Sequence, residues 1–130
     1  MKHGSVILLS ALGLALAAAQ AVAETWPTKP IKAIVPIAPG SVIDIVPRTV
    51  FAQLSDQLGQ AIVVENRPGA GTTLGVGAVA RADPDGYTVL VNSSAHAIAP
   101  ALHPNLAYHP SRDFAAVTPL GVTPFVLVVS

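Results

Sequence analysis

The chain has 130 residues, of which 11% are charged, and a formal net charge of zero at pH 7. Hydrophobic residues make up 52% of it, which indicates a packed core rather than a disordered chain. The balanced charge gives no electrostatic signal for nucleic acid or an anionic membrane as a partner. The absence of cysteine excludes disulfides and thiolate metal sites.

Residues 1–23 have the pattern of a secretory signal peptide. A short basic start (residues 1–3) precedes an uncharged, mostly apolar run (6–19), and residues 21–23 fit the small-x-small pattern of a signal-peptidase site. The alternative is an uncleaved anchor, but the run is short for a membrane span of about 20 residues. We expect cleavage after Ala23.

A sharp turn between a buried strand and a helix organises the first part of the mature chain. The near-continuous apolar run 31–37 predicts a strand covered on both faces. Ser41 and Asp44 follow at the spacing of helix-capping residues, and Gly59 is placed as a C-cap. Because Pro47 removes a backbone hydrogen bond inside a helix, we expect an irregular first turn and regular helix from about Asp44.

The remaining elements alternate between strand and helix. A second helix begins at Thr72 or Thr73, and its interior glycines, Gly75 and Gly77, predict close packing on the sheet. The order β-α-β-α-β predicts an α/β domain with a mostly parallel sheet and flanking helices. The further predicted strands are 61–65, 87–91, 114–120 and 124–129, with a short apolar piece at 97–102.

Two polar turns, residues 39–44 and 92–96, follow predicted strands one and three. Carboxyl ends of parallel strands meet at one edge of a sheet, where ligands bind in open α/β folds. Unpaired amides and the helix dipole favour an anion at such a turn. Arg48 and Arg67 are the nearby cations. The sequence therefore predicts a carboxylate site built from backbone amides, hydroxyls and the His96 imidazole.

Other motifs give weaker signals. Gly75 and Gly77 open a pattern resembling a dinucleotide fingerprint, but they fall inside a helix rather than in a strand-to-helix turn. Ser93, Ser94, His96 and Asp44 are the residue types of a hydrolytic triad, yet neither serine lies in a G-x-S-x-G elbow. The histidines match no common zinc spacing. We therefore expect no cofactor, no metal and no nucleic-acid partner.

Several segments occur in a recognisable order: WPTKPI (26–31), IVPIAPG (34–40) with Asp44 and Arg48, ENRPGAG (65–71), PDGY (84–87) and DF (113–114). This set resembles the periplasmic solute receptors of tripartite tricarboxylate transporters, also called the Bug family. The resemblance implies a non-enzymatic receptor with two α/β lobes that close on a ligand. It binds a di- or tricarboxylate or another organic acid and passes it to membrane permease subunits.

The resemblance also implies the site residues. Loops corresponding to residues 36–44 and 93–96 supply backbone amides and ordered water to the carboxylate. The chain departs from the family pattern at Ser41, Val42 and Ile43, where a glycine and small polar residues are usual, and this favours a less polar acid. The residues assigned by position are Pro36, Ala38, Gly40, Ser41, Ile43, Asp44, Ser93, Ser94 and His96.

The family chain is far longer, so residues 24–130 are expected to be an incomplete first lobe, from a truncated gene or a partial record. One lobe alone is expected to bind weakly or not at all, and the full-length receptor is expected to be a monomer. Two alternatives stay open: a small secreted hydrolase that uses Ser94 and His96, and a non-functional truncated remnant.

Overall fold

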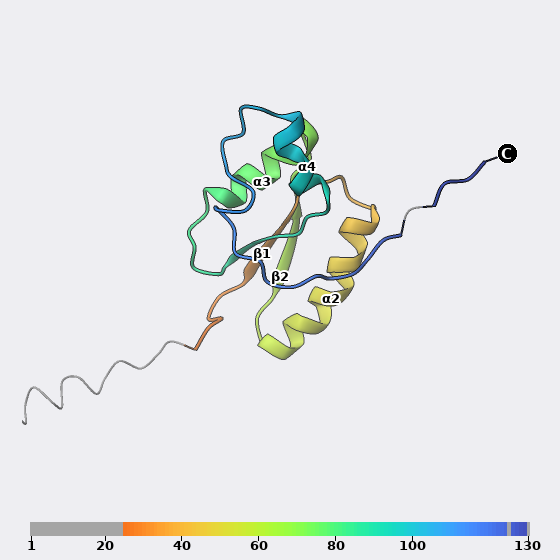
Figure 1. Ribbon diagram of the computed structural model, residues 1–130. Coiled ribbons are helices and arrows are strands. Elements are labelled where there is room, and N and C mark those ends of the chain that lie inside the picture. The colour runs from red at the N-terminus through yellow and green to blue at the C-terminus, as the bar shows by residue number, and fades with distance from the viewer. Residues whose placement is uncertain (1–24, 125, 130) are drawn as a thin grey trace, which may run out of the picture.

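A computed structural model describes residues 25–124 and 126–129 (Figure 1), so the predicted signal peptide lies outside the described residues. No helix in this described part is long and apolar enough to cross a membrane. In chain order, the elements are β1 (Ile31–Val35), α2 (Val42–Leu58), β2 (Ile62–Asn66), the short 3₁₀ helix η2 (Ala70–Thr72), α3 (Thr73–Ala80), β3 (Thr88–Leu90) and α4 (Ala95–Leu102).

The three strands form a parallel sheet in the order β2-β1-β3. In the register, Ile31 lies opposite Ile62, and Lys32 lies opposite both Val63 and Thr88. Each crossover between strands contains a helix, as parallel pairing requires. The predicted α/β class and the parallel sheet are therefore confirmed.

The central strand β1 is buried on both faces. Ala33 and Val35 pack with Phe51 of α2 and with Val91, and all four are buried. Ile34, whose side chain points to the opposite face of the pleat, is fully buried, as is Val76 of α3. Figure 1 shows α2 on one side of the sheet and α3 on the other, so β1 is the core of a three-layer arrangement.

Helix α2 begins earlier than expected. Its N-cap is Ser41, and regular helix runs from Val42 rather than from Asp44, with Pro47 inside the helix. The Ser41 hydroxyl makes no capping hydrogen bond, so the predicted side-chain cap is wrong. The Ser41 carbonyl accepts from the amides of Asp44 and Ile45. Pro47 is fully buried, so its packing compensates for the missing donor. Gly59 adopts the expected left-handed C-cap conformation.

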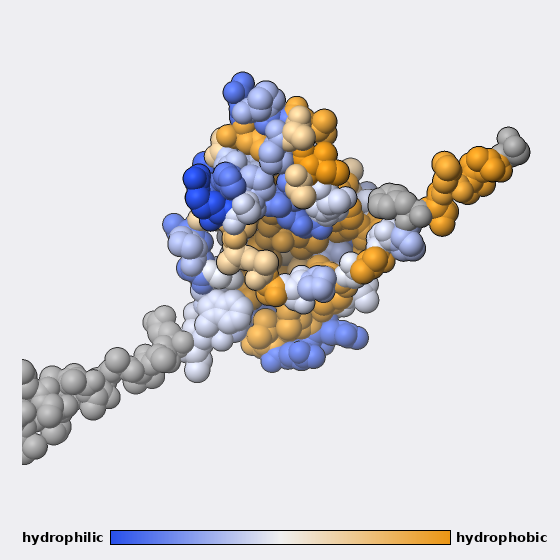
Figure 2. Space-filling model, in the orientation of Figure 1, coloured by the Kyte–Doolittle hydropathy of each residue, from blue (hydrophilic) through white to orange (hydrophobic). Residues whose placement is uncertain are grey.

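Some predicted strand boundaries are wrong. β1 ends at Val35 instead of 37, because Pro36 has no N–H to continue the ladder. The segment predicted as a short apolar piece is part of helix α4. The stretches 114–124 and 126–129 contain no strand. Residues 126–129 are 81–94% exposed and run away from the sheet (Figure 2), so no strand lies beside them to pair with.

Gly75 explains how α3 approaches the sheet so closely. A Cβ at this position would lie 2.7 Å from the Arg67 carbonyl oxygen and 2.8 Å from the Pro36 Cβ. At Gly77 the nearest atom, on the Arg81 guanidinium, is 3.4 Å away. Close packing therefore accounts for the first of the two helix glycines but not for the second.

Candidate functional site: a loop edge organised by Asp44

The two polar turns lie at the same edge of the sheet. The first follows β1 and the second follows β3, and these strands are parallel neighbours. A third segment, residues 67–72, follows β2 and reaches the same edge. This third segment was not among the predicted site residues. The β2-β1-β3 strand order places it there by putting β2 directly beside β1, and local sequence patterns contain no signal for that order.

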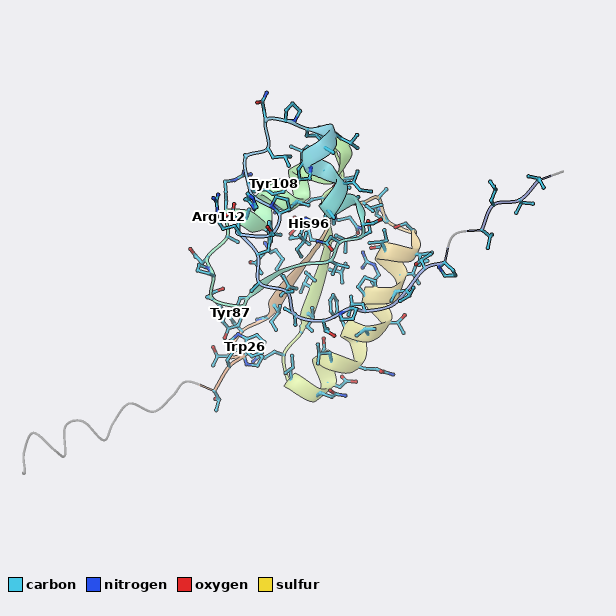
Figure 3. All side chains as sticks on the ribbon, viewed as in Figure 1. Trp26, Tyr87, His96, Tyr108 and Arg112 are labelled. Carbon is cyan, nitrogen blue, oxygen red and sulfur yellow. The ribbon has the colours of Figure 1, made fainter. Side chains whose placement is uncertain are left out.

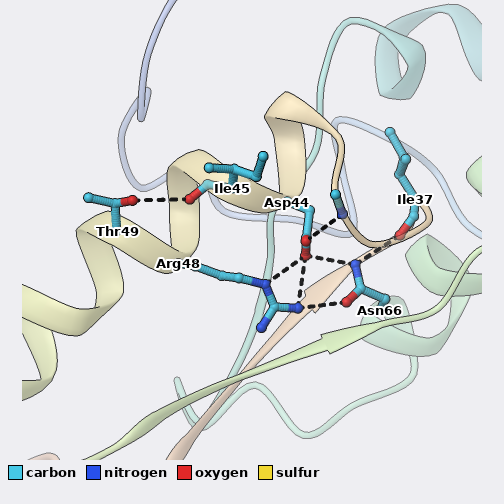
Figure 4. A network of polar contacts seen from close by, with 7 residues as sticks. Ile37, Asp44, Ile45, Arg48, Thr49 and Asn66 are labelled. Carbon is cyan, nitrogen blue, oxygen red and sulfur yellow. Dashed lines mark hydrogen bonds and ion pairs between the residues drawn. The ribbon is translucent and has the colours of Figure 1, made fainter.

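Asp44 is the centre of a polar network between the first turn, α2 and the end of β2 (Figure 4). Its carboxylate is buried, with a relative exposure of 3% for the residue. One oxygen, Oδ2, accepts a hydrogen bond from the Gly40 amide at 2.9 Å. The other, Oδ1, accepts from Arg48 Nε at 3.0 Å and from Asn66 Nδ2 at 2.8 Å.

Asn66 and Arg48 close this network. Asn66 Nδ2 also donates to the Ile37 carbonyl at 3.0 Å, and Arg48 Nη2 donates to Asn66 Oδ1 at 2.7 Å. Arg48 follows Asp44 by four residues, so both side chains lie on one face of α2. Arg48 was predicted only as a nearby cation, and Asn66 was not predicted to have a role.

The network keeps Asp44 ionised. The hydrogen bond from Arg48 is the largest cause, followed by those from the Gly40 amide and the Asn66 side chain, and together they hold the pKa of Asp44 far below its usual range despite burial. A negative charge at the start of α2 is also favourable to the helix dipole. The first turn therefore already contains one compensated anion that belongs to the protein.

The amides of the first turn divide into two groups. The Gly40 amide donates to Asp44, and the Asp44 amide donates to the Ser41 carbonyl. In the part of the chain that the structure describes, five amides of residues 36–44 have no hydrogen-bond acceptor. The Ser41 hydroxyl is also without a partner. These amides belong to Ile37, Ala38, Ser41, Val42 and Ile43.

The second turn begins helix α4. The Ser93 carbonyl accepts from the His96 amide, the Ser94 carbonyl accepts from the amides of Ala97 and Ile98, and the Ser93 hydroxyl accepts from the Ala95 amide at 3.3 Å. No hydrogen bond in the described residues joins this turn to residues 36–44. The structure thus places both turns at one edge, each with its own internal hydrogen bonds.

The His96 ring packs against the segment that follows α4. It stacks on Tyr108, which Figure 3 labels beside it, with ring centroids 6.2 Å apart. It meets Phe114 edge-on, with ring centroids 5.0 Å apart. Its Nε2 lies 2.9 Å from the Pro110 carbonyl oxygen. No hydrogen bond joins His96 to either serine hydroxyl in the described residues. The arrangement therefore lacks the serine–histidine contact of a hydrolase.

A hollow of about 570 Å³ lies between α4 and residues 103–111. His96, His103 and Tyr108 line it, and no residue of the first turn does. Among the residues that the structure describes, no three histidine or acidic side chains are placed to hold a metal ion. The hollow thus borders the second turn at His96 but does not reach the first turn.

Comparisons with known proteins place these features in a family. The profile described as "Tripartite tricarboxylate transporter family receptor" matches residues 46–130. A UPF0065 protein of Bordetella bronchiseptica is 41% identical over 124 residues, which is 95% of this chain and 37% of that protein. The chain spans between 27% and 40% of the length of the curated relatives it matches.

Solved structures agree with the sequence match. The periplasmic binding protein BugD is 40% identical with a TM-score of 0.66, over 68% of this chain and 30% of that one. MatC of Rhodopseudomonas palustris, solved with malate, is 43% identical with a TM-score of 0.65, over 68% and 31%. A second R. palustris protein, solved with adipate, is 29% identical with a TM-score of 0.57, over 66% and 29%. The chain therefore forms part of one lobe of a periplasmic-binding-protein fold and belongs to the tripartite tricarboxylate transporter receptor family.

Proposed function

We propose that this chain is the carboxylate-binding part of a periplasmic receptor that delivers an organic acid to a tripartite transporter. The observation that carries the proposal is the edge shared by the two polar turns, with unpaired amides at the start of α2. Family membership and the malate and adipate found in related structures support the same class of ligand. The receptor function is proposed for the whole protein, of which this chain is a part.

In the proposed site, dipoles rather than formal charges hold the ligand carboxylate. The unpaired amides at the N-terminus of α2 point the positive end of the helix dipole towards an anion. Hydroxyls of the second turn add donors, and each hydrogen bond to a charged partner adds about 1.5–3 kcal/mol. We propose contacts from Pro36, Ala38, Gly40, Ser41, Ile43, Ser93, Ser94 and His96.

The proposed ligand is an acid with an apolar body. Val42 is 54% exposed at the rim of the first turn, and neither it nor Ile43 offers a side-chain donor. Such a rim favours aliphatic carbons next to the bound carboxylate more than additional hydroxyl or carboxyl groups. A dicarboxylate with a methylene chain fits this better than citrate does.

The proposed location and partners of this protein are those of its family. We propose export through the predicted signal peptide, with cleavage after Ala23, and capture of the acid in the periplasm by a receptor that is monomeric at full length. Membrane permease subunits are the proposed recipients. Mass spectrometry of the mature protein tests the cleavage site, because a mature chain that begins at Glu24 is expected.

The site can be tested by amide NMR with adipate, malate and citrate as probes. Each acid is titrated into the chain beside its uncharged dimethyl or trimethyl ester. We expect the free acids, but not the esters, to shift the amide signals of residues 41–43 and 93–94, with adipate acting at the lowest concentration. Equal shifts with the esters, or shifts confined to residues around the hollow beside α4, would contradict the proposed site.

A further inference from the structure

We infer that Asp44 is a positioning residue, which holds the first ligand turn (residues 36–44) in shape through the Gly40 amide instead of contacting the ligand. Both carboxylate oxygens already accept hydrogen bonds from the protein, from Gly40 on one side and from Arg48 and Asn66 on the other. The side chain is also buried. A ligand group would have to displace one of these donors to reach it.

The network fixes the turn at two points. Gly40 has φ +88°, a left-handed conformation, and its amide is held by Asp44. Three residues earlier, the Ile37 carbonyl is held by the same Asn66 side chain that donates to Asp44. Because Asn66 is the last residue of β2, the turn is tied to the sheet as well as to the helix. Loss of Asp44 would therefore release the backbone on both sides of Pro39.

Arg48 has a distinct part in this arrangement. Its guanidinium contacts the Asp44 carboxylate at 2.9–3.0 Å and neutralises a charge that lies within one helical turn of the proposed carboxylate site. Without Arg48, a buried carboxylate would repel a second anion at the same helix start. Asp44 and Arg48 thus form a neutral pair, so the remaining amides can attract the anion. The ligand part of this inference rests on the proposed function, whereas the network itself does not.

The decisive experiment compares Asp44→Asn with Asp56→Asn. Both residues are on α2 and both changes remove one negative charge, but Asp56 is exposed and its carboxylate makes no hydrogen bond in the described residues. Amide hydrogen exchange of Gly40, followed by NMR, measures how firmly the turn is held. We expect exchange at Gly40 to be at least tenfold faster in Asp44→Asn and unchanged in Asp56→Asn.

Ligand affinity is measured on the same proteins with adipate as the probe. Loss of the charged hydrogen bond that orders the turn is expected to weaken adipate binding about tenfold to a hundredfold in Asp44→Asn, with no change in Asp56→Asn. Arg48→Gln should weaken it as well. The double variant Asp44→Asn/Arg48→Gln should bind adipate more tightly than Arg48→Gln alone, because it no longer contains an uncompensated carboxylate.

The possible results separate the inference from the proposed function. Unchanged Gly40 exchange in Asp44→Asn would overturn the inference, and so would faster exchange with unchanged adipate affinity. If adipate binds none of the proteins, the proposal that this part of the receptor holds adipate by itself fails, while Gly40 exchange still decides the role of Asp44. Should Asp44→Asn fail to fold, Asn66→Ala provides a second exchange test, since it removes the bond to Ile37 and one of the donors that orient the Asp44 carboxylate. Gly40 exchange should then rise by a smaller factor, and unchanged exchange would overturn the inference.

Discussion

Gly75→Ala and Gly77→Ala, the two glycine-to-alanine replacements in α3, should change the free energy of unfolding in opposite directions. At Gly75 the new Cβ would lie 2.7 Å from the Arg67 carbonyl oxygen and 2.8 Å from the Pro36 Cβ, so backbone or ring atoms must move. Overpacking of this kind costs about 1–3 kcal/mol, and the gain in helix propensity returns about 1 kcal/mol. The expected net loss for Gly75→Ala is therefore up to about 2 kcal/mol.

Gly77→Ala is the matched control, because it makes the same chemical change in the same helix. Its Cβ would meet the flexible end of Arg81 at 3.4 Å and the Tyr108 ring at 3.7 Å, both tolerable contacts. The helix-propensity gain then remains, so we expect this variant to be more stable than the parent by up to about 1 kcal/mol.

Urea unfolding followed by far-ultraviolet circular dichroism measures both variants. The expected difference of about 1–3 kcal/mol between them corresponds to a separation in melting temperature of roughly 4–24 °C for a domain of this size. Gly75→Ala should also shift the amide signals of the first turn, because Pro36 must move. Equal stability of the two variants would refute the argument that Gly75 is required for the contact between α3 and Pro36.

Three further outcomes are expected. Thr72 has φ +81° and a buried hydroxyl without a partner in the described residues, so Thr72→Gly should raise the free energy of unfolding by about 1 kcal/mol; an unchanged melting temperature would contradict this. Folding lowers the pKa of Asp44, so the ionised side chain stabilises the fold fully above about pH 4, near its unfolded pKa, and less as the pH falls further. Between about pH 5 and pH 2, the free energy of unfolding should therefore fall less in Asp44→Asn than in the parent protein, whereas Asp56→Asn should follow the parent. Tyr87→Phe removes the hydroxyl that accepts a hydrogen bond from the Thr28 amide at 2.8 Å. Urea unfolding should show a free energy of unfolding lower by about 0.5–1.5 kcal/mol, whereas no loss would mean that water replaces this bond.

The order of elements could be predicted because each depends on local signals. Apolar runs bounded by proline and glycine define β1 and β2, and their alternation with helices implies parallel pairing. The same signals misled at 114–120 and 124–129. Valine-rich composition fits a pleated strand, but a strand exists only where another strand offers its backbone, and composition contains no information about that neighbour.

The parts of the site that were missed depend on contacts distant in sequence. Asn66 reaches Asp44 only because β2 pairs with β1 in a register that places Asn66 opposite Val35. His96 turns towards Tyr108 and Phe114 because the segment after α4 folds back over the helix. Neither the register nor this fold-back is written in local periodicity, so the sequence could indicate the edge where the site lies but not which donors are free.

The distribution of charge at this edge determines what kind of recognition the turn can provide. Arg48 is paired with Asp44, and Arg67 is paired with Glu65, so both cations that the sequence placed near the site already have an acidic partner. An anion that binds here would meet oriented amides and hydroxyls rather than an uncompensated guanidinium. Dipoles attract over short distances and only in the correct orientation, which makes affinity depend on the shape of the turn. This dependence is the physical reason why a buried residue that fixes the turn, such as Asp44, should matter to binding as much as the groups that touch the ligand.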